Sequence, residues 1–264
     1  MCMKTGTWAK DRTNHEVFSY NGQNYTYDKM YNLIKDLDYH KSGEDCDWNI
    51  IRVHDLVRDR DCYCVVFQES DSKADWLHNF NFLPCRVKAY KGWKHRLIYH
   101  KGFYDEWQSA RDEIKSYLSP LLTDLANEQG CGVNELILYV IGWSLGGAIS
   151  VIASEDFHEM YGMKPIMIAF EGANPCESYH TRNYIQSVLD EESTSFVYSN
   201  DFVCRCPPFF GKILKKTVYY LNDHKCKFPF YLFRKLLSFI IDTYHYHTSA
   251  DEGILKYMPQ ETAE

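Results

Sequence analysis

Several features that define whole classes of protein are missing from this sequence. No uninterrupted apolar run approaches the roughly 20 residues that a membrane-spanning helix requires. Positive charge does not dominate, because the net charge is −7 at neutral pH. This balance argues against nucleic acid, or an anionic membrane surface, as a general partner. There is no internal repeat and no low-complexity segment, and a length of 264 residues suits one large domain.

Signals of secretion and of metal binding are also weak. Residues 1–6 lack the apolar core of a secretory signal. Among the ten cysteines, Cys62 and Cys64 lie in an apolar, strand-like run, and Cys204 and Cys206 flank an arginine. Neither C-x-C pair has the C-x-x-C spacing of zinc sites, so we expect buried, reduced thiols. These features predict an intracellular protein, with a signal peptide either absent or removed before the numbering begins. Peripheral contact to a lipid surface is compatible with this prediction.

The strongest pattern in the chain lies within residues 137–155. Residues 137–141 form an apolar run rich in β-branched side chains and predict a buried strand, and the residues from Ala148 onward predict a buried helix. Residues 142–146 between them form a G-x-S-x-G pattern, in which glycines leave room for a sharp turn that exposes the serine hydroxyl. The helix aims its first N–H groups at a developing oxyanion. This context distinguishes Ser144, the candidate nucleophile, from a structural serine in a chance match.

The rest of the chain predicts an alternation of strands and helices. Buried strands are expected at residues 48–53, 62–67, 165–171, 195–199 and 217–221, the first two joined by a charged turn at 58–61. Amphipathic helices are expected at residues 28–39 and 105–128, the second with a kink or break near Pro120. Asp105 and Glu106, near its start, suit the helix dipole.

Polar residues follow two of these strands. Ser70 follows the strand at 62–67, where an α/β sheet places its ligand, and it is either a hydroxyl donor or a simple turn serine. Asp201 follows the strand at 195–199, where an acid that orients a histidine and a turn-capping aspartate are equally expected. His245 and His247 then complete the order Ser, Asp, His. Because no third ligand accompanies this H-x-H spacing, we expect no metal.

Residues 226–241 are strongly apolar and aromatic. A helix from about Tyr231 would be apolar on much of its circumference, which favours packing in the core. The alternative is a lid or interfacial helix that opens on a lipid surface.

Taken in order, these motifs resemble the class 3 (fungal-type) lipases, which have an α/β-hydrolase-like fold. The resemblance runs from about Trp48 to Pro208. The motifs that carry it are residues 67–70 with Asp75, Trp76 and Asn79 (family F-R-G-[TS]-x(4)-[DN]-W-x-x-N), 100–103 (H-x-G-F), 142–148 (G-H-S-L-G-G-A), 170–175 (loosely F-G-x-P-R) and 200–208 (N-D-x-V-P-R-x-P-P). The resemblance implies a single α/β domain over residues 1–264, with a central, mostly parallel sheet flanked by helices. Residues 1–45 would form an N-terminal helical or irregular extension, and 209–264 a C-terminal segment with the catalytic histidine.

The resemblance also implies roles for individual residues. Ser144 would be the nucleophile and Asp201 the acid of the triad. Ser70, together with the backbone N–H of Leu145, would hold the oxyanion. The lid of the family begins just after the position of Ser70, which places residues 71–82 at the mouth of the site.

Two departures from the family pattern fall beside this site. Asp71, Trp76 and Trp143 are the expected lid or substrate-binding residues, and Trp143 stands where the family usually has a histidine, which reshapes the acyl pocket. Glu69 replaces a glycine beside the oxyanion hole and adds bulk and charge near a site that must stabilise an anion.

The catalytic histidine is the least determined member of the triad. In fungal members it follows the Pro-Pro pair closely, whereas here no histidine lies between Pro208 and His224. His247, followed by residues 248–251, looks most like the family's H-S-x-x-E context. We therefore rank His247 first, His245 second and His224 third.

The sequence thus predicts a serine ester hydrolase, of the triacylglycerol lipase or phospholipase type. It would cleave fatty-acyl esters of glycerolipids at a lipid–water interface through an acyl-enzyme, without a cofactor. The apolar and aromatic character of the lid region and of residues 226–241 favours acyl lipids. Two alternatives stay open, namely a catalytically inactive lipase-fold lipid-binding or scaffold protein and a carboxylesterase for soluble esters. Head group, acyl length and oligomeric state are not indicated.

Overall fold

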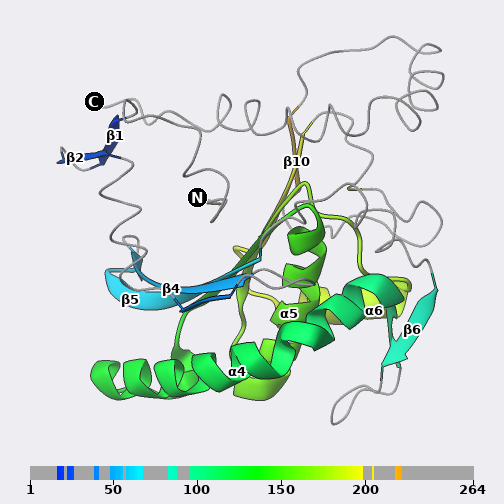
Figure 1. Cartoon of the computed structure of the whole chain (residues 1–264), viewed down its shortest axis with the longest axis horizontal. Coiled ribbons are helices and arrows are strands. Elements are labelled where there is room, and N and C mark those ends of the chain that lie inside the picture. The colour runs from blue at the N-terminus through cyan, green and yellow to red at the C-terminus, as the bar shows by residue number, and fades with distance from the viewer. Residues whose placement is uncertain are drawn as a thin grey trace.

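The apolar runs of the sequence assemble into one main sheet with helices packed against it (Figure 1). The computed structural model describes residues 17–20, 23–26, 39–41, 48–55, 58–67, 83–87, 96–198, 204 and 218–221. The helix expected at residues 28–39 falls outside these ranges except for Tyr39, which begins a strand instead. Residues 226–241 and the lid segment 71–82 also lie outside them.

The main sheet has, among the described residues, seven strands in the order β11-β10-β9-β8-β5-β4-β3. Its strands are β3 (Tyr39–Lys41), β4 (Trp48–Asp55), β5 (Arg60–Phe67), β8 (Leu138–Trp143), β9 (Ile166–Phe170), β10 (Thr194–Tyr198) and β11 (Val218–Leu221). Neighbours from β11 to β5 are parallel, whereas β4 is antiparallel to both β5 and β3. The expected strands and the α/β class with a mostly parallel sheet are therefore confirmed.

The register of the parallel strands brings the candidate site to one edge. Phe67 of β5 pairs with Gly142 of β8, and Gly142 pairs in turn with Ala169 of β9. The residues that follow these three strands therefore leave the sheet at the same end. This is the edge at which open α/β sheets bind their ligands.

Two short antiparallel ribbons accompany the sheet. One pairs β1 (Val17–Tyr20) with β2 (Gln23–Thr26), and the other pairs β6 (Pro84–Val87) with β7 (Leu97–His100). The sequence did not indicate either ribbon, because strands of four residues contain too few alternations to stand out.

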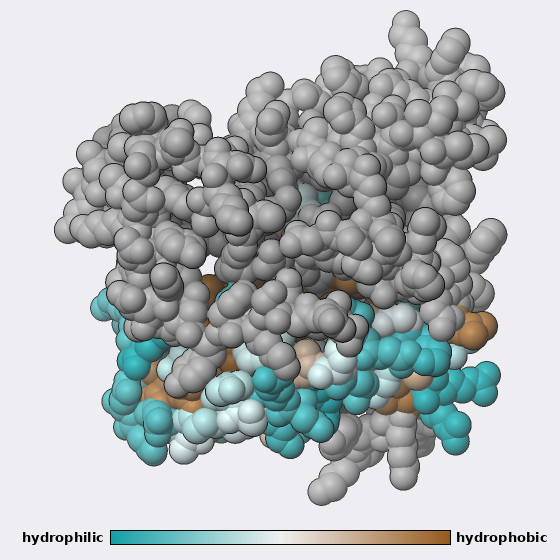
Figure 2. Space-filling model, in the orientation of Figure 1, coloured by the Kyte–Doolittle hydropathy of each residue, from teal (hydrophilic) through white to brown (hydrophobic). Residues whose placement is uncertain are grey.

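The helices formed by the described residues lie on one side of the sheet (Figure 1). They are α4 (Lys101–Gln129), α5 (Leu145–Tyr161) and α6 (Tyr179–Val188), with a short 3₁₀ helix, η1, at Val133–Glu135. Helix α5 packs on β8 and β9, and α4 packs across α5. The exposed surface in the lower part of the molecule, where α4 lies, is mostly hydrophilic (Figure 2).

Helix α4 corrects two expectations. It continues through Pro120 without a break, because Leu118 and Leu122 on either side of the proline are fully buried and hold the chain to the core. It also begins at Lys101, so Asp105 and Glu106 lie in the second turn and no acidic residue stands in the first. The interaction expected with the helix dipole is therefore absent from this helix, since that effect is confined to the first turn. Gly130, with a φ of 65°, ends the helix.

The two faces of the sheet carry separate apolar clusters. The larger one joins inward side chains of β5, β8 and β9, such as Val65, Val140 and Met167, to the buried faces of α4 and α5. The smaller one, on the opposite face, includes Ile141, Trp143 and Phe170. Helix α5 is buried on all sides from Leu145 to Phe157, which explains why its sequence lacks an amphipathic period.

The six described cysteines are free thiols. Cys62 and Cys64 on β5 are buried, as predicted, and Cys176 and Cys204 are buried as well. Burial raises the pKa of Cys62, Cys64 and Cys176 to about 12. In the described part of the chain, no helix combines the length and apolarity needed to cross a membrane.

Candidate active site

A sharp turn joins β8 to α5, and Ser144 is the residue at its apex. Its backbone has a φ of 53° and a ψ of −115°, a combination that costs an L-residue about 1–3 kcal/mol. Gly142 permits the turn, because a Cβ at that position would lie 2.0 Å from the carbonyl oxygen of Gly146. The glycine in the first half of the G-x-S-x-G pattern is therefore required by contact with the glycine in the second half.

The helix that follows the turn packs unusually close to the end of β9. A Cβ on Gly147 would lie 2.6 Å from the Cα of Gly172. Glycine at position 147 is therefore required for this approach, which brings the start of α5 and the segment after β9 into backbone contact.

Hydrogen bonds fix the backbone of Ser144 from both sides. Its N–H donates to the carbonyl oxygen of Phe170 at 2.9 Å, and its own carbonyl oxygen accepts from the N–H of Ala173 at 3.3 Å. The side chain is fully buried, and its Oγ has no hydrogen-bond partner among the described residues. Leu145 is the first residue of α5, so its N–H belongs to the turn that lacks intrahelical acceptors. Within the described ranges, a strained serine whose hydroxyl has no hydrogen-bond partner thus adjoins a backbone N–H at the start of α5.

Trp143 is the last residue of β8, and it packs across the sheet. Its ring stacks on Phe170 with centroids 6.1 Å apart, and Phe170 stacks on Phe196 of β10 at 5.0 Å. This row of rings belongs to the smaller apolar cluster. The expected contribution of Trp143 to substrate binding stays a prediction.

Sequence reasoning missed Glu171, the residue that follows β9. It has a φ of 50°, is fully buried, and accepts a hydrogen bond from the Sγ of Cys204 at 3.1 Å. Its N–H donates to the carbonyl oxygen of Phe196 at 2.9 Å. The signal was present in the sequence, because Glu171 stands where the resembled family motif has glycine.

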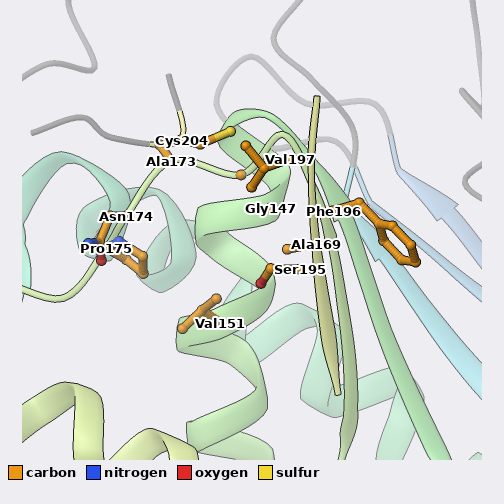
Figure 3. A pocket seen from close by; sticks show the side chains of 11 residues that line it. Gly147, Val151, Ala169, Ala173, Asn174, Pro175, Ser195, Phe196, Val197 and Cys204 are labelled. Carbon is orange, nitrogen blue, oxygen red and sulfur yellow. The ribbon is translucent and has the colours of Figure 1, made fainter. Parts of the chain in front are cut away.

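A small, partly open pocket lies beside this segment (Figure 3). It is lined by Gly147 and Val151 of α5, by residues of β9 and β10, by residues 172–175 and by Cys204. Ser144 does not line it. The pocket is therefore a neighbour of the elbow and not the cavity that would hold a reacting carbonyl group at Ser144.

The other predicted site residues lie outside the described residues. They are Ser70, Asp71, Trp76, Asp201, His224, His245 and His247. Their roles stay predictions. Within the described ranges there is no group of three His, Cys, Asp or Glu side chains that could hold a metal ion.

The comparison with known proteins agrees with this fold. The model of the lipase (class 3) family matches residues 64–211, more than half of the chain, and the protein therefore belongs to the class 3 lipase family. No curated protein sequence matches the chain.

Solved structures of fungal lipases share the fold at low sequence identity. A mutant of MDLA from Penicillium cyclopium superimposes with a TM-score of 0.55 at 19% identity, covering 72% of this chain and 64% of that one. The triacylglyceride lipase of Rhizomucor miehei has a TM-score of 0.54 at 19% identity, with coverages of 70% and 67%. Lipase II from Rhizopus niveus has a TM-score of 0.50 at 18% identity, with coverages of 64% and 60%. The chain thus spans roughly two thirds or less of these relatives, and the likeness establishes the fold.

Proposed function

We propose that this protein is a serine ester hydrolase that cleaves fatty-acyl esters of glycerolipids. The observation that carries the proposal is the turn at Ser144, which combines a strained backbone, a hydroxyl without a partner among the described residues, and the first N–H groups of α5. Membership in the class 3 lipase family supports a carboxylic ester hydrolase with a lipid substrate.

The chemistry follows the serine triad. Neutral His247 accepts the proton of Ser144 while Oγ bonds to the ester carbonyl carbon, and Asp201 accepts the other imidazole N–H and stabilises the imidazolium. The N–H of Leu145 and the donors of Ser70 bind the oxyanion, and the loss of one donor costs about a hundredfold or more in rate. Collapse breaks the C–O bond to the alcohol, which leaves with the proton from the imidazolium. Water, deprotonated by the same imidazole, then releases the fatty acid from Ser144.

The substrate we propose is an acyl lipid at a lipid–water interface. Residues 71–82, with Asp71 and Trp76, would stand at the mouth of the site, and the apolar composition of residues 226–241 supports contact with acyl chains. Activation by micelles or an emulsion is the expected behaviour. Equal rates on dissolved and aggregated ester would instead favour a carboxylesterase.

A catalytically inactive lipid-binding or scaffold protein is the competing proposal. It rests on Glu69, which adds a carboxylate beside the proposed oxyanion hole, and on the separation of the histidines from Pro208. A fluorophosphonate probe distinguishes the two, because it modifies an activated serine. Labelling of the wild type and its loss in Ser144→Ala supports the enzyme, whereas a folded wild type without labelling supports the scaffold.

Hydrolysis of p-nitrophenyl esters then assigns the base. The wild type is compared with His224→Ala, His245→Ala and His247→Ala across several acyl lengths. Loss of turnover in His247→Ala alone supports the proposed triad, and loss in one of the other two variants moves the role to that residue.

A further inference from the structure

Glu171 occupies a position between the elbow and the next strand of the sheet. Residues on both sides of Glu171 bond to Ser144. The carbonyl oxygen of Phe170 accepts from the Ser144 N–H at 2.9 Å, and the N–H of Ala173 donates to the Ser144 carbonyl oxygen at 3.3 Å. Its own N–H reaches the carbonyl oxygen of Phe196 on β10 at 2.9 Å. The backbone of Glu171 therefore links the serine turn to β10, the strand that precedes the predicted acid.

The side chain of Glu171 makes a second link in the same direction. Its Oε2 accepts from the Sγ of Cys204 at 3.1 Å, and both side chains are almost completely removed from solvent. Cys204 follows Asp201 by three residues. Figure 3 places Cys204 beside Val197 and Ala173, at the level of the start of α5. The carboxyl group of Glu171 thus contacts the residue three positions after the predicted triad acid.

We propose that Glu171 is a positioning residue of the active site, whose buried carboxyl group holds Cys204 and thereby positions the predicted acid Asp201, three residues earlier in the chain. The inference rests on the proposed function and adds to it a residue outside the triad. A hydrogen bond shielded from water is stronger than an exposed one, and leaving either buried group without its partner costs free energy. Such a bond fits a task of holding a loop in one place.

The backbone of Glu171 adds a second argument. A non-glycine residue with a φ of 50° is strained, and glycine would adopt this conformation freely. Glycine here would keep the backbone links and remove the whole side chain, including the carboxyl group. If the carboxyl group positions Cys204, Glu171→Gly should therefore relieve backbone strain and lose activity at the same time.

The chain offers a matched control. Asp59, in the turn between β4 and β5, has a φ of 51° and a side chain that is 96% exposed. Asp59→Gly relieves the same kind of strain at a site remote from Cys204. It should raise the melting temperature slightly and leave kcat and KM unchanged.

The experiment measures kcat, KM and melting temperature for Glu171→Gly, Glu171→Gln, Cys204→Ala and Cys204→Ser of the full chain on p-nitrophenyl butyrate. We expect Glu171→Gly to keep or raise the melting temperature while kcat falls by about ten- to a hundredfold and KM changes little, because a small misplacement of catalytic groups costs this much. Cys204→Ala should lose kcat similarly. Cys204→Ser, which keeps a donor, should retain most of it.

The pH dependence of kcat/KM separates positioning from a purely structural role, because a residue that only stabilises the fold would leave this dependence unchanged. If loss of the bond to Cys204 moves the Asp201 carboxylate away from the imidazole, the imidazolium is stabilised less, and the acidic limb of kcat/KM should shift to lower pH in Glu171→Gly. Parallel loss of melting temperature and kcat in both Glu171 variants, with an unshifted limb, would overturn the proposal. So would full activity in Glu171→Gly.

The two proposals fail in different ways. If the wild type is folded but is neither labelled by fluorophosphonate nor active, the proposed function and this inference fall together. If the wild type is labelled and active while Glu171→Gly matches it, only the positioning role is overturned. Should Glu171→Gly not fold, Glu171→Gln and the two Cys204 variants decide the question on their own.

Discussion

Gly147 and Gly172 meet backbone to backbone, and a single added methyl group on Gly147 would lie 2.6 Å from the Cα of its partner. The contact joins the first turn of α5 to the segment after β9. Both segments hold Ser144, because α5 begins directly after it and Ala173 bonds to its carbonyl oxygen. The position of the serine therefore depends on two residues that have no side chains.

Gly147→Ala should lower the free energy of unfolding by about 1–3 kcal/mol, the usual cost of overpacking. The backbone of Gly172 cannot rotate away as a side chain would, so α5 must shift. Thermal unfolding measures the effect, expected as a fall of several degrees for a chain of this size. Gly130→Ala is the control, since its Cβ meets no atom within 4 Å and only its φ of 65° opposes the change. Equal losses in the two variants would contradict the close contact.

Ser144→Gly should raise stability while it abolishes turnover. Glycine accepts the φ of 53° more readily than serine, and the change removes a buried hydroxyl that has no partner among the described residues. The gain should be about 1 kcal/mol, because glycine also loses more chain entropy on folding. Denaturant unfolding of Ser144→Gly beside Ser144→Ala tests this, since alanine keeps the strain. A glycine variant less stable than the alanine variant would contradict strain at the elbow.

Pro120→Ala should stabilise the protein without changing activity. Proline in the interior of α4 withholds an N–H from the helix and crowds the carbonyl of the preceding turn, at a cost of about 3 kcal/mol. The residue is exposed, so alanine opens no cavity. We expect a gain of about 1–3 kcal/mol in urea unfolding, reduced by the greater freedom of the unfolded chain. Lys115→Ala, at another exposed position of α4, should change stability little.

Titration of Glu155 should lower the free energy of unfolding as the pH rises toward 8. Burial, reinforced by the neighbouring charge of Asp156, raises its pKa from 4.5 to about 8, and the Oη of Tyr99 contacts its Oε2 at 3.1 Å. The folded state therefore keeps a proton that the unfolded state has lost. The stabilising contribution is complete below pH 4.5 and is lost as the pH rises through 8, by at most about 1.4 kcal/mol per pH unit.

Glu155→Gln isolates this contribution. The amide does not titrate, so urea unfolding between pH 6 and 8 should show a shallower fall for the variant than for the wild type. Comparing the two slopes cancels other groups, including buried Glu177, whose pKa burial raises to about 7. Identical slopes would show that Glu155 keeps an ordinary pKa.

The sequence was most informative where local rules and burial act together. The apolar runs of β4, β5, β8 and β9 and the G-x-S-x-G turn could be read directly, because each satisfies a period or a steric requirement on its own. The continuity of α4 through Pro120 could not be predicted from the sequence. Packing of Leu118 and Leu122 in the core outweighs the local tendency of proline to break a helix. The sequence marked Glu171 only as a departure from the family motif, because its conformation and its role depend on partners from β10 and Cys204 that are remote in the sequence.

The reactivity of the buried thiols of β5 reports how often the sheet opens. Alkylating reagents consume thiolate, and a pKa of about 12 leaves Cys62 and Cys64 almost entirely protonated at neutral pH. Modification must then wait until the strand separates from β8 and β4. Its rate at each of the two cysteines would report how often the centre of this protein opens to water, without any added label.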